Sequence, residues 1–189
     1  MQYIGIDLSI SSTGIVVLEG NTTEPLLAEA ILSKKPDRGD LDRFIDIAER
    51  ISDKIGSVRV VGEIALFVLM ENMAFGAKGQ LTRLAELRGI VQYHLLKNLY
   101  IRVLYASIQT LKKYAAGRGA GKGKGPVMVG CYKSWGFETQ CDDIADAYVL
   151  AQMAKELDYF IFNRKVNQEL PKYRQECIET IRKGNKIKK

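Results

Sequence analysis

The first third of the chain carries short apolar runs of the kind that form strands, followed by one helical period. We expect strands at residues 1–8, 15–18 and 26–32, with a turn at 11–14. Their close spacing predicts an antiparallel meander. The segment 40–55 then places apolar residues on one helical face, with Asp40 as a candidate N-cap: Leu41, Phe44, Ile45, Ala48, Ile51 and Ile55.

Strand and helix patterns alternate through the middle of the chain. Residues 66–70 are continuously apolar, which suits a strand that is buried on both faces in a parallel connection. A helical period follows at 81–95, and a fifth strand is expected at 101–105.

The rest of the sequence indicates helices. We expect them at 108–115, from Pro126 onward, at 142–157 and at 167–183. Residues 117–125 hold five glycines in nine positions, which predicts a flexible loop between the first two of these helices.

Three hairpin strands followed by alternating helices and strands are typical of the ribonuclease-H-like fold. We therefore expect an α/β protein with a five-stranded mixed sheet, three strands antiparallel and two parallel, flanked by helices. The first and fourth strands would run parallel, side by side. We expect this domain to span 1–163 and a basic helical extension to span 164–189, where five of the final eight residues are Lys or Arg.

Composition narrows the class of protein. Of the 189 residues, 47% are hydrophobic and 26% are charged, which suits a soluble domain with one core. The longest apolar run, 64–70, is too short to span a bilayer, and no signal peptide is visible. Three cysteines without CxxC spacing and one histidine argue against zinc or disulfides. We expect a reducing, intracellular location.

Positive charge is concentrated in one stretch of the sequence. The net charge is +6, and no acidic residue lies between Glu86 and Glu138. The basic residues there are Arg88, Lys97, Arg102, Lys112, Lys113, Arg118, Lys122, Lys124 and Lys133. A solvated surface is one explanation. The interleaving of Gly with Lys and Arg favours a polyanionic partner instead.

Carboxylates stand at the ends of the expected elements. Asp7 ends the first strand and Glu71 ends the fourth, so the two would converge if those strands are neighbours. Asp143 and Asp146 open a helix three residues apart and project to the same side. Asp142, four residues before Asp146, is an alternative to Asp143.

Such a cluster has a chemical reason. Carboxylates that repel one another have raised pKa values, and divalent cations remove that penalty. Oxygen ligands suit Mg²⁺, and two ions can assist displacement at a phosphodiester. Singly, Asp7 also fits a turn, and Asp142 and Asp143 fit a helix cap. Glu71 is the hardest to explain otherwise, because it follows the apolar run directly.

Four segments resemble motifs of the RuvC-type Holliday junction resolvases. IGIDLSISSTGIVVL (4–18) resembles the first motif and LMENMAFGAKGQLTRLAELRGIV (69–91) the second. LKKYAAGRGAGKGKGPVMV (111–129) resembles the basic loop of that family, and DDIADAYVLAQ (142–152) resembles its last motif. The order and spacing of the four segments are more specific than any one of them.

The resemblance implies an endonuclease that cuts four-way DNA junctions as a homodimer. Its metal ligands, for two Mg²⁺ or Mn²⁺ ions, would be Asp7, Glu71, Asp143 and Asp146. The lysines of its basic loop would be Lys112 and Lys124, with Lys122 as an alternative to Lys124 because the loop is one residue longer here. The residues that we expect to contact DNA phosphates are Lys112, Lys113, Arg118, Lys122 and Lys124.

Other features of the resemblance are less regular. Phe75, one position later than expected, would be the aromatic residue near the junction centre. Leu8 and Ser9 replace a frequent Pro-Gly pair, which suggests a divergent, phage- or virus-encoded member. The helix at 79–97 is a candidate dimer element, with ordinary core packing as the alternative.

Three other functions compete with this interpretation. An actin-like or sugar-kinase-like ATPase shares the first motif but needs a second subdomain that 189 residues do not supply. A non-catalytic nucleic-acid-binding protein would explain the basic stretch but not Glu71. A nuclease for flaps or other branched DNA is the nearest alternative.

Overall fold

The structure is a computed structural model of the chain that describes residues 1–33, 39–59, 66–72, 80–117, 125–163 and 165–187. In these ranges the strands are β1 (Gln2–Asp7), β2 (Ser12–Glu19), β3 (Pro25–Leu32), β4 (Leu66–Asn72) and β5 (Val103–Ser107). The helices are α1 (Asp40–Ser57), α2 (Gln80–Leu99), α3 (Ile108–Ala116), α4 (Gly125–Trp135), α5 (Asp142–Asn163) and α6 (Lys172–Gly184).

The strands form one mixed sheet in the order β3-β2-β1-β4-β5. β1 pairs antiparallel with β2, and β2 with β3, whereas β4 runs parallel to β1 and β5 parallel to β4. The predicted five-stranded mixed sheet is therefore confirmed, with the first and fourth strands adjacent at its centre.

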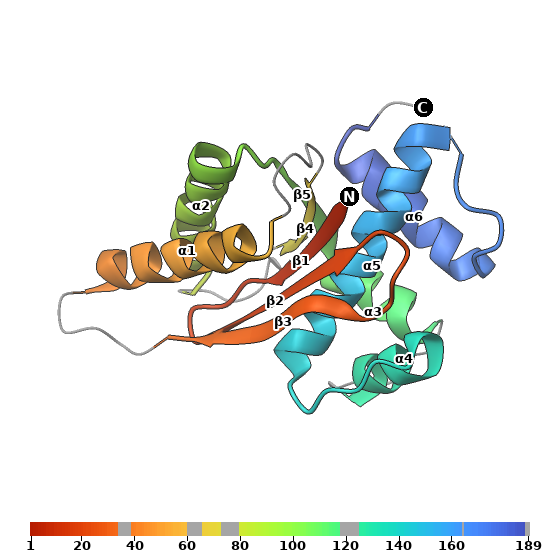
Figure 1. The fold of residues 1–189 in the computed structure, drawn as a ribbon, viewed down its shortest axis with the longest axis horizontal. Coiled ribbons are helices and arrows are strands. Elements are labelled where there is room, and N and C mark those ends of the chain that lie inside the picture. The colour runs from red at the N-terminus through yellow and green to blue at the C-terminus, as the bar shows by residue number, and fades with distance from the viewer. Residues whose placement is uncertain (34–38, 60–65, 73–79, 118–124, 164, 188–189) are drawn as a thin grey trace.

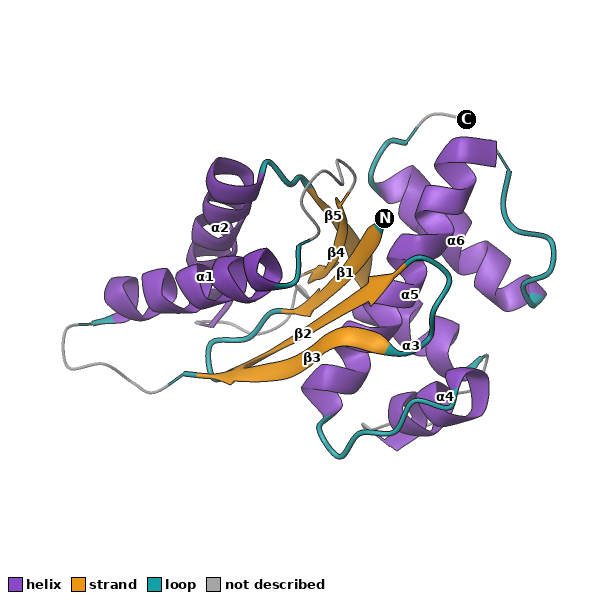
Figure 2. Cartoon of the chain, viewed as in Figure 1, coloured by secondary structure: helices purple, strands orange, loops and turns teal. Residues whose placement is uncertain are grey.

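Helices cover both faces of the sheet. Figure 1 shows α1 and α2 on one side of the strands, and α5 on the other with α3, α4 and α6 around it. Figure 2 gives the same view by secondary structure, with the sheet between the two helical layers. Side chains alternate along β1: Ile4 and Ile6 pack with α1 and α2, whereas Tyr3 and the atoms around Gly5 lie on the α5 side.

Several element boundaries differ from the expected ones. The segment 11–14, expected as a turn, lies mostly in β2, because Thr13 and Gly14 pair with residues of β3. The fifth strand begins at Val103 rather than at 101. Asp40 is not an N-cap: Gly39 takes that position, and Asp40 lies in the first turn of α1, where it pairs with Arg83 of α2.

The last two helices also have different limits. α5 continues past the expected end at 157 to Asn163, and Phe160 in this added part is fully buried in the core. α6 begins at Lys172 rather than at 167. Helical backbone is disfavoured at Leu170 because a proline follows it, and Pro171 itself has an extended conformation at the N-cap.

α6 packs into the same core as the sheet. Cys177, Ile178 and Ile181 are buried in one cluster with residues of α3, α4 and α5. The expected division of the chain at residue 163 stays a prediction, but the two parts share this cluster. No helix in the described residues is long and apolar enough to cross a membrane.

Candidate active site

Asp7 and Glu71 lie side by side at one edge of the sheet. Ile6 is paired with Met70 in the parallel β1–β4 register, so the next residue on each strand is the acid. Gly5 of β1 and Leu69 of β4 lie on the face of the sheet that α5 covers. Side chains alternate along a strand, so Asp7 and Glu71, two residues further on, lie on the same face. The two carboxyl groups are close enough that each affects the pKa of the other.

Two glycines bring α5 close enough to contribute to this edge. A Cβ on Gly5 would lie 1.8 Å from the carbonyl oxygen of Ala147, and one on Gly14 would lie 2.0 Å from that of Asp143. Both values are far below any contact that real Cβ atoms make. The first turns of α5 therefore rest directly on the backbone of β1 and β2.

This packing completes a group of three carboxylates. Asp7, Glu71 and Asp146 each offer one oxygen, and these oxygens all lie within 4.8 Å of one another. All three side chains are half-buried. Strand pairing supplies two members and the close approach of α5 supplies the third, so residues far apart in the sequence meet at one point.

The ionisation of the three acids reflects their crowding. Burial, the charge of Glu71 and the charges at the start of α5 raise the pKa of Asp7 to about 8. Burial, together with Asp7 and Asp142, raises the pKa of Asp146 to about 7, although the positive charge of Lys112 opposes the shift. Burial also raises the pKa of Glu71. A positive charge bound between the carboxylate oxygens would therefore be stabilised at this site.

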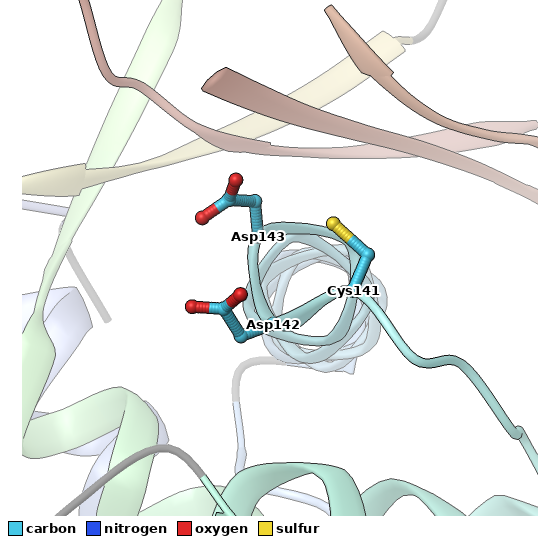
Figure 3. Close-up of side chains that lie close together, drawn as sticks. All are labelled: Cys141, Asp142 and Asp143. Atoms are coloured by element: carbon cyan, nitrogen blue, oxygen red, sulfur yellow. The ribbon is translucent and has the colours of Figure 1, made fainter. Parts of the chain in front are cut away.

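Asp143 lies outside the three-carboxylate group. Its carboxylate accepts a hydrogen bond from the Ser12 hydroxyl at the start of β2. Asp143 also forms a second potential ligand group with Cys141 and Asp142, again within 4.8 Å. Figure 3 shows these three side chains at the N-terminal end of α5. The charges of Asp142 and Asp143 both act on Asp7 and Asp146, so the two acids flank the group.

Sequence reasoning missed several of the residues that surround these acids. It did not assign roles to Ser12, Cys141 or Gly5, although the small residues in the first motif were a usable signal. Whether Asp142 or Asp143 is the fourth ligand stays open, as it was in the sequence.

Of the predicted DNA-contact residues, the structure describes Lys112 and Lys113. Lys112, on α3, is close enough to lower the pKa of Glu71 and Asp146. Lys113 forms an ion pair with Glu176 of α6, with a nitrogen–oxygen distance of 2.6 Å. The remaining predicted residues lie outside the described part of the chain: Phe75, Arg118, Lys122 and Lys124.

The donor set fits a divalent cation. It consists of carboxylate oxygens, the ligands that Mg²⁺ and Mn²⁺ accept. A bound cation would also relieve the repulsion that raises the pKa values of the three acids. The predicted ligands Asp7, Glu71 and Asp146 are the residues that would hold it.

No protein-family model matches this chain, and no curated protein matches it in sequence. Two of the solved structures that match its architecture are structures of RuvC. Thermus thermophilus RuvC has a TM-score of 0.66 at 20% identity, covering 86% of this chain and 97% of that one. T. thermophilus RuvC in complex with Holliday junction substrate has a TM-score of 0.65 at 18% identity, covering 84% and 94%. The chain has the fold of RuvC.

This likeness confirms the predicted fold class. The RuvC-like fold covers most of the chain, and it places the carboxyl end of β1 beside that of β4. Ligand sites of α/β sheets gather at such ends of parallel strands, which is where Asp7 and Glu71 lie.

Proposed function

We propose that the protein is a metal-dependent endonuclease that cuts branched DNA, with four-way junctions as its main substrate. The observation that carries the proposal is the convergence of Asp7, Glu71 and Asp146 on a RuvC-like fold. One of the two similar structures is RuvC in complex with a Holliday junction substrate. The basic stretch between Glu86 and Glu138 gives this chain a matching preference for a polyanion.

The proposed cofactor is a pair of Mg²⁺ or Mn²⁺ ions. Asp7, Glu71 and Asp146 would hold them, with Asp143 or Asp142 as a further ligand. When bound, the ions would supply charge stabilisation for an in-line phosphodiester displacement, and the expected products carry 5′-phosphate and 3′-hydroxyl ends. The residues bind and orient: β1 and β4 fix two carboxylates, and α5 fixes the third.

The basic residues would position the substrate. Lys112 stands beside the acids and would contact the phosphate at the cleavage site, and Arg118, Lys122 and Lys124 would contact other phosphates of the substrate. A phosphate contact by Lys113 has to compete with Glu176. Phe75 would be the aromatic contact near the junction centre. An enzyme of this kind would act in the cytoplasm, where junctions form in a bacterial or phage-infected cell.

A four-way junction needs two symmetric cuts, so the proposed enzyme acts as a two-fold dimer. The outward face of α2 supports this assignment. Its small residues Ala85 and Gly89 are exposed, and Tyr93 and Leu96 on the same face are 58% and 50% exposed. Small residues followed by apolar ones give two helices room to pack closely.

The test is a digest of matched four-way junction, flap and linear duplex DNA by the purified protein, with MgCl₂ and with EDTA. We expect paired cuts in the junction, only with MgCl₂, and little cutting of the duplex. Preferential cutting of the flap would favour the flap-nuclease alternative. Tight junction binding without cleavage in Mg²⁺ or Mn²⁺ would favour a non-catalytic binding protein.

A further inference from the structure

The C-terminal segment, which consists of α6 and Asn185, contacts β5 at the edge of the sheet. The side-chain amide of Asn185 accepts a hydrogen bond from the backbone N–H of Tyr105 at 2.9 Å and donates one to its carbonyl oxygen at 2.8 Å. One side chain therefore satisfies both backbone groups of an edge-strand residue, as a neighbouring strand would.

Arg174 of α6 joins three elements. Only 7% of this side chain is exposed, and its Nε donates to the carbonyl oxygen of Tyr114 in α3 at 2.9 Å. A second guanidinium nitrogen donates to the Ser134 hydroxyl of α4 at 2.5 Å, and the group lies 4.4 Å from the ring centre of Trp135. A buried charge is costly unless it is satisfied, and these partners satisfy it.

A third contact lies between the first two along α6. Glu176 forms its ion pair with Lys113 of α3 while Cys177 and Ile178 are buried against the same part of the core. β5 and α3 follow one another without a break in the chain. The C-terminal segment therefore contacts this β5–α3 unit at three residues: Tyr105, Lys113 and Tyr114.

The same β5–α3 unit carries Lys112 to the acids. Ala106 of β5 is paired with Glu71, and α3 begins two residues later at Ile108. Lys112 is therefore little more than one helical turn away from the strand that flanks Glu71. Two of the three contacts described above are made by the next two residues in the chain, Lys113 and Tyr114.

We propose that α6 and Asn185 form a brace that fixes Lys112 against the Asp7–Glu71–Asp146 group, with Arg174 as its main positioning residue. A cation acts on the site only at short range, because Coulomb energy falls with distance and rises as water is excluded. A free α3 would let Lys112 move into solvent. The brace thus makes the C-terminal segment part of the proposed active site, although it contributes no ligand.

Magnesium affinity tests the brace without any DNA. Lys112→Met removes a cation that repels Mg²⁺, so calorimetric titration with MgCl₂ at pH 8 should show binding tighter by about threefold to tenfold. Arg174→Met, which removes the hydrogen bonds, should tighten binding in the same direction by a smaller factor. Lys172→Met, an exposed change on the same helix, is the control and should leave the affinity unchanged.

Arg174→Met could change Mg²⁺ affinity by displacing Lys112, by loosening the fold in general, or by removing the charge of Arg174 itself. A double-mutant cycle separates the first effect from the other two. In the Lys112→Met background, Arg174→Met should change Mg²⁺ affinity no further. An equal effect of Arg174→Met in both backgrounds, or no effect in either, would overturn the proposal. Asn185→Ala releases the other end of β5–α3 and should give the same coupling; it replaces Arg174→Met if circular dichroism shows that the latter is unfolded.

The cleavage readout rests on the proposed function. Arg174→Met should lower kcat on junction DNA in the wild-type background and leave it unchanged in the Lys112→Met background. A uniform loss of kcat in both would mean a merely structural role and would overturn the brace. If no variant and no wild type cleaves DNA, but the Mg²⁺ coupling holds, the proposed function fails and the brace stands.

Discussion

The two faces of the central sheet use the same strands for different purposes. On the face covered by α1 and α2, Ile4, Ile6 and Met70 are fully buried among other apolar side chains. On the face covered by α5, the residues one position away include Gly5 and Asp7. Because side chains alternate along a strand, neighbouring positions separate stability from chemistry.

The difference has an energetic consequence. The α1–α2 face gains from apolar burial. The α5 face instead gathers carboxylates whose pKa values are raised by burial and, to a smaller extent, by the charges of their neighbours. Proteins accept such destabilised clusters at functional sites, and the rest of the fold offsets them. The comparison predicts that substitutions on the α5 face mainly lower activity, whereas substitutions on the α1–α2 face mainly lower stability.

The largest effect is expected from Asp146→Asn on the α5 face. Loss of this ligand should reduce Mg²⁺-dependent junction cleavage by at least about a hundredfold, since even outer-shell changes at metal sites cost 10- to 100-fold. Junction binding should remain, because the basic residues are untouched. The control is Asp46→Asn on the exposed side of α1, which should keep full activity. Cleavage rates under single-turnover conditions decide, and near wild-type cleavage by Asp146→Asn would refute the assignment.

Gly5→Ala and Ile4→Val compare the two faces at adjacent positions. The new Cβ of Gly5→Ala would overlap the Ala147 carbonyl oxygen, so α5 has to shift, at a cost of about 3 kcal/mol. Ile4→Val removes one buried methyl group and should cost about 1 kcal/mol. Chemical denaturation measures both. Cleavage by the folded fraction should fall only for Gly5→Ala, and equal activity of the two variants would contradict the role given to the glycine.

The contrast between the faces also explains what the sequence could and could not predict. The order of strands and helices along the chain followed from apolar periodicity, and Asp7 and Glu71 were recognised because each acid comes directly after an apolar run. The separation of Asp143 from Asp146 was not predictable, because it depends on how closely α5 approaches Gly5 and Gly14.

The C-terminal helix shows the same limit. Its periodicity indicated a helix, and its charge suggested a basic extension. Nothing in that pattern identified Arg174 as buried, because its partners Tyr114 and Ser134 are 60 and 40 residues away. Contacts between elements decide such positions, and a single sequence does not display them.

The carboxylates of the α5 face should also make stability depend on pH. Asp7 and Asp146 have pKa values of about 8 and 7 in the folded protein, against an ordinary 3.8. The folded state then holds more protons, so their stabilising contribution is complete below pH 3.8 and lost as pH rises through about 8. In EDTA, the Tm should fall between pH 6 and pH 9, and Asp146→Asn should reduce that fall. MgCl₂ should raise the Tm at pH 8; a Tm that is flat with pH and unaffected by Mg²⁺ would contradict the clustering.

The smallest effect on the metal site is expected from the outer surface of the opposite layer. Tyr93→Asp places a charge on the exposed face of α2 and should convert the proposed dimer to a monomer of 21.2 kDa. Affinity for Mg²⁺ should not change, because α2 lies across the sheet from the acids. Sedimentation at micromolar concentration measures the mass, and a wild-type protein that is monomeric with and without junction DNA would refute the dimer.

The location of a bound cation tests the central claim most directly. A crystal soaked in MnCl₂ should give anomalous difference density between the carboxylates of Asp7, Glu71 and Asp146, and crystals of Asp146→Asn should lose it. The neighbouring group of Cys141, Asp142 and Asp143 provides an internal comparison within the same crystal. Density only at that second group, or none at either, would contradict the assignment of the three-carboxylate group as the metal centre.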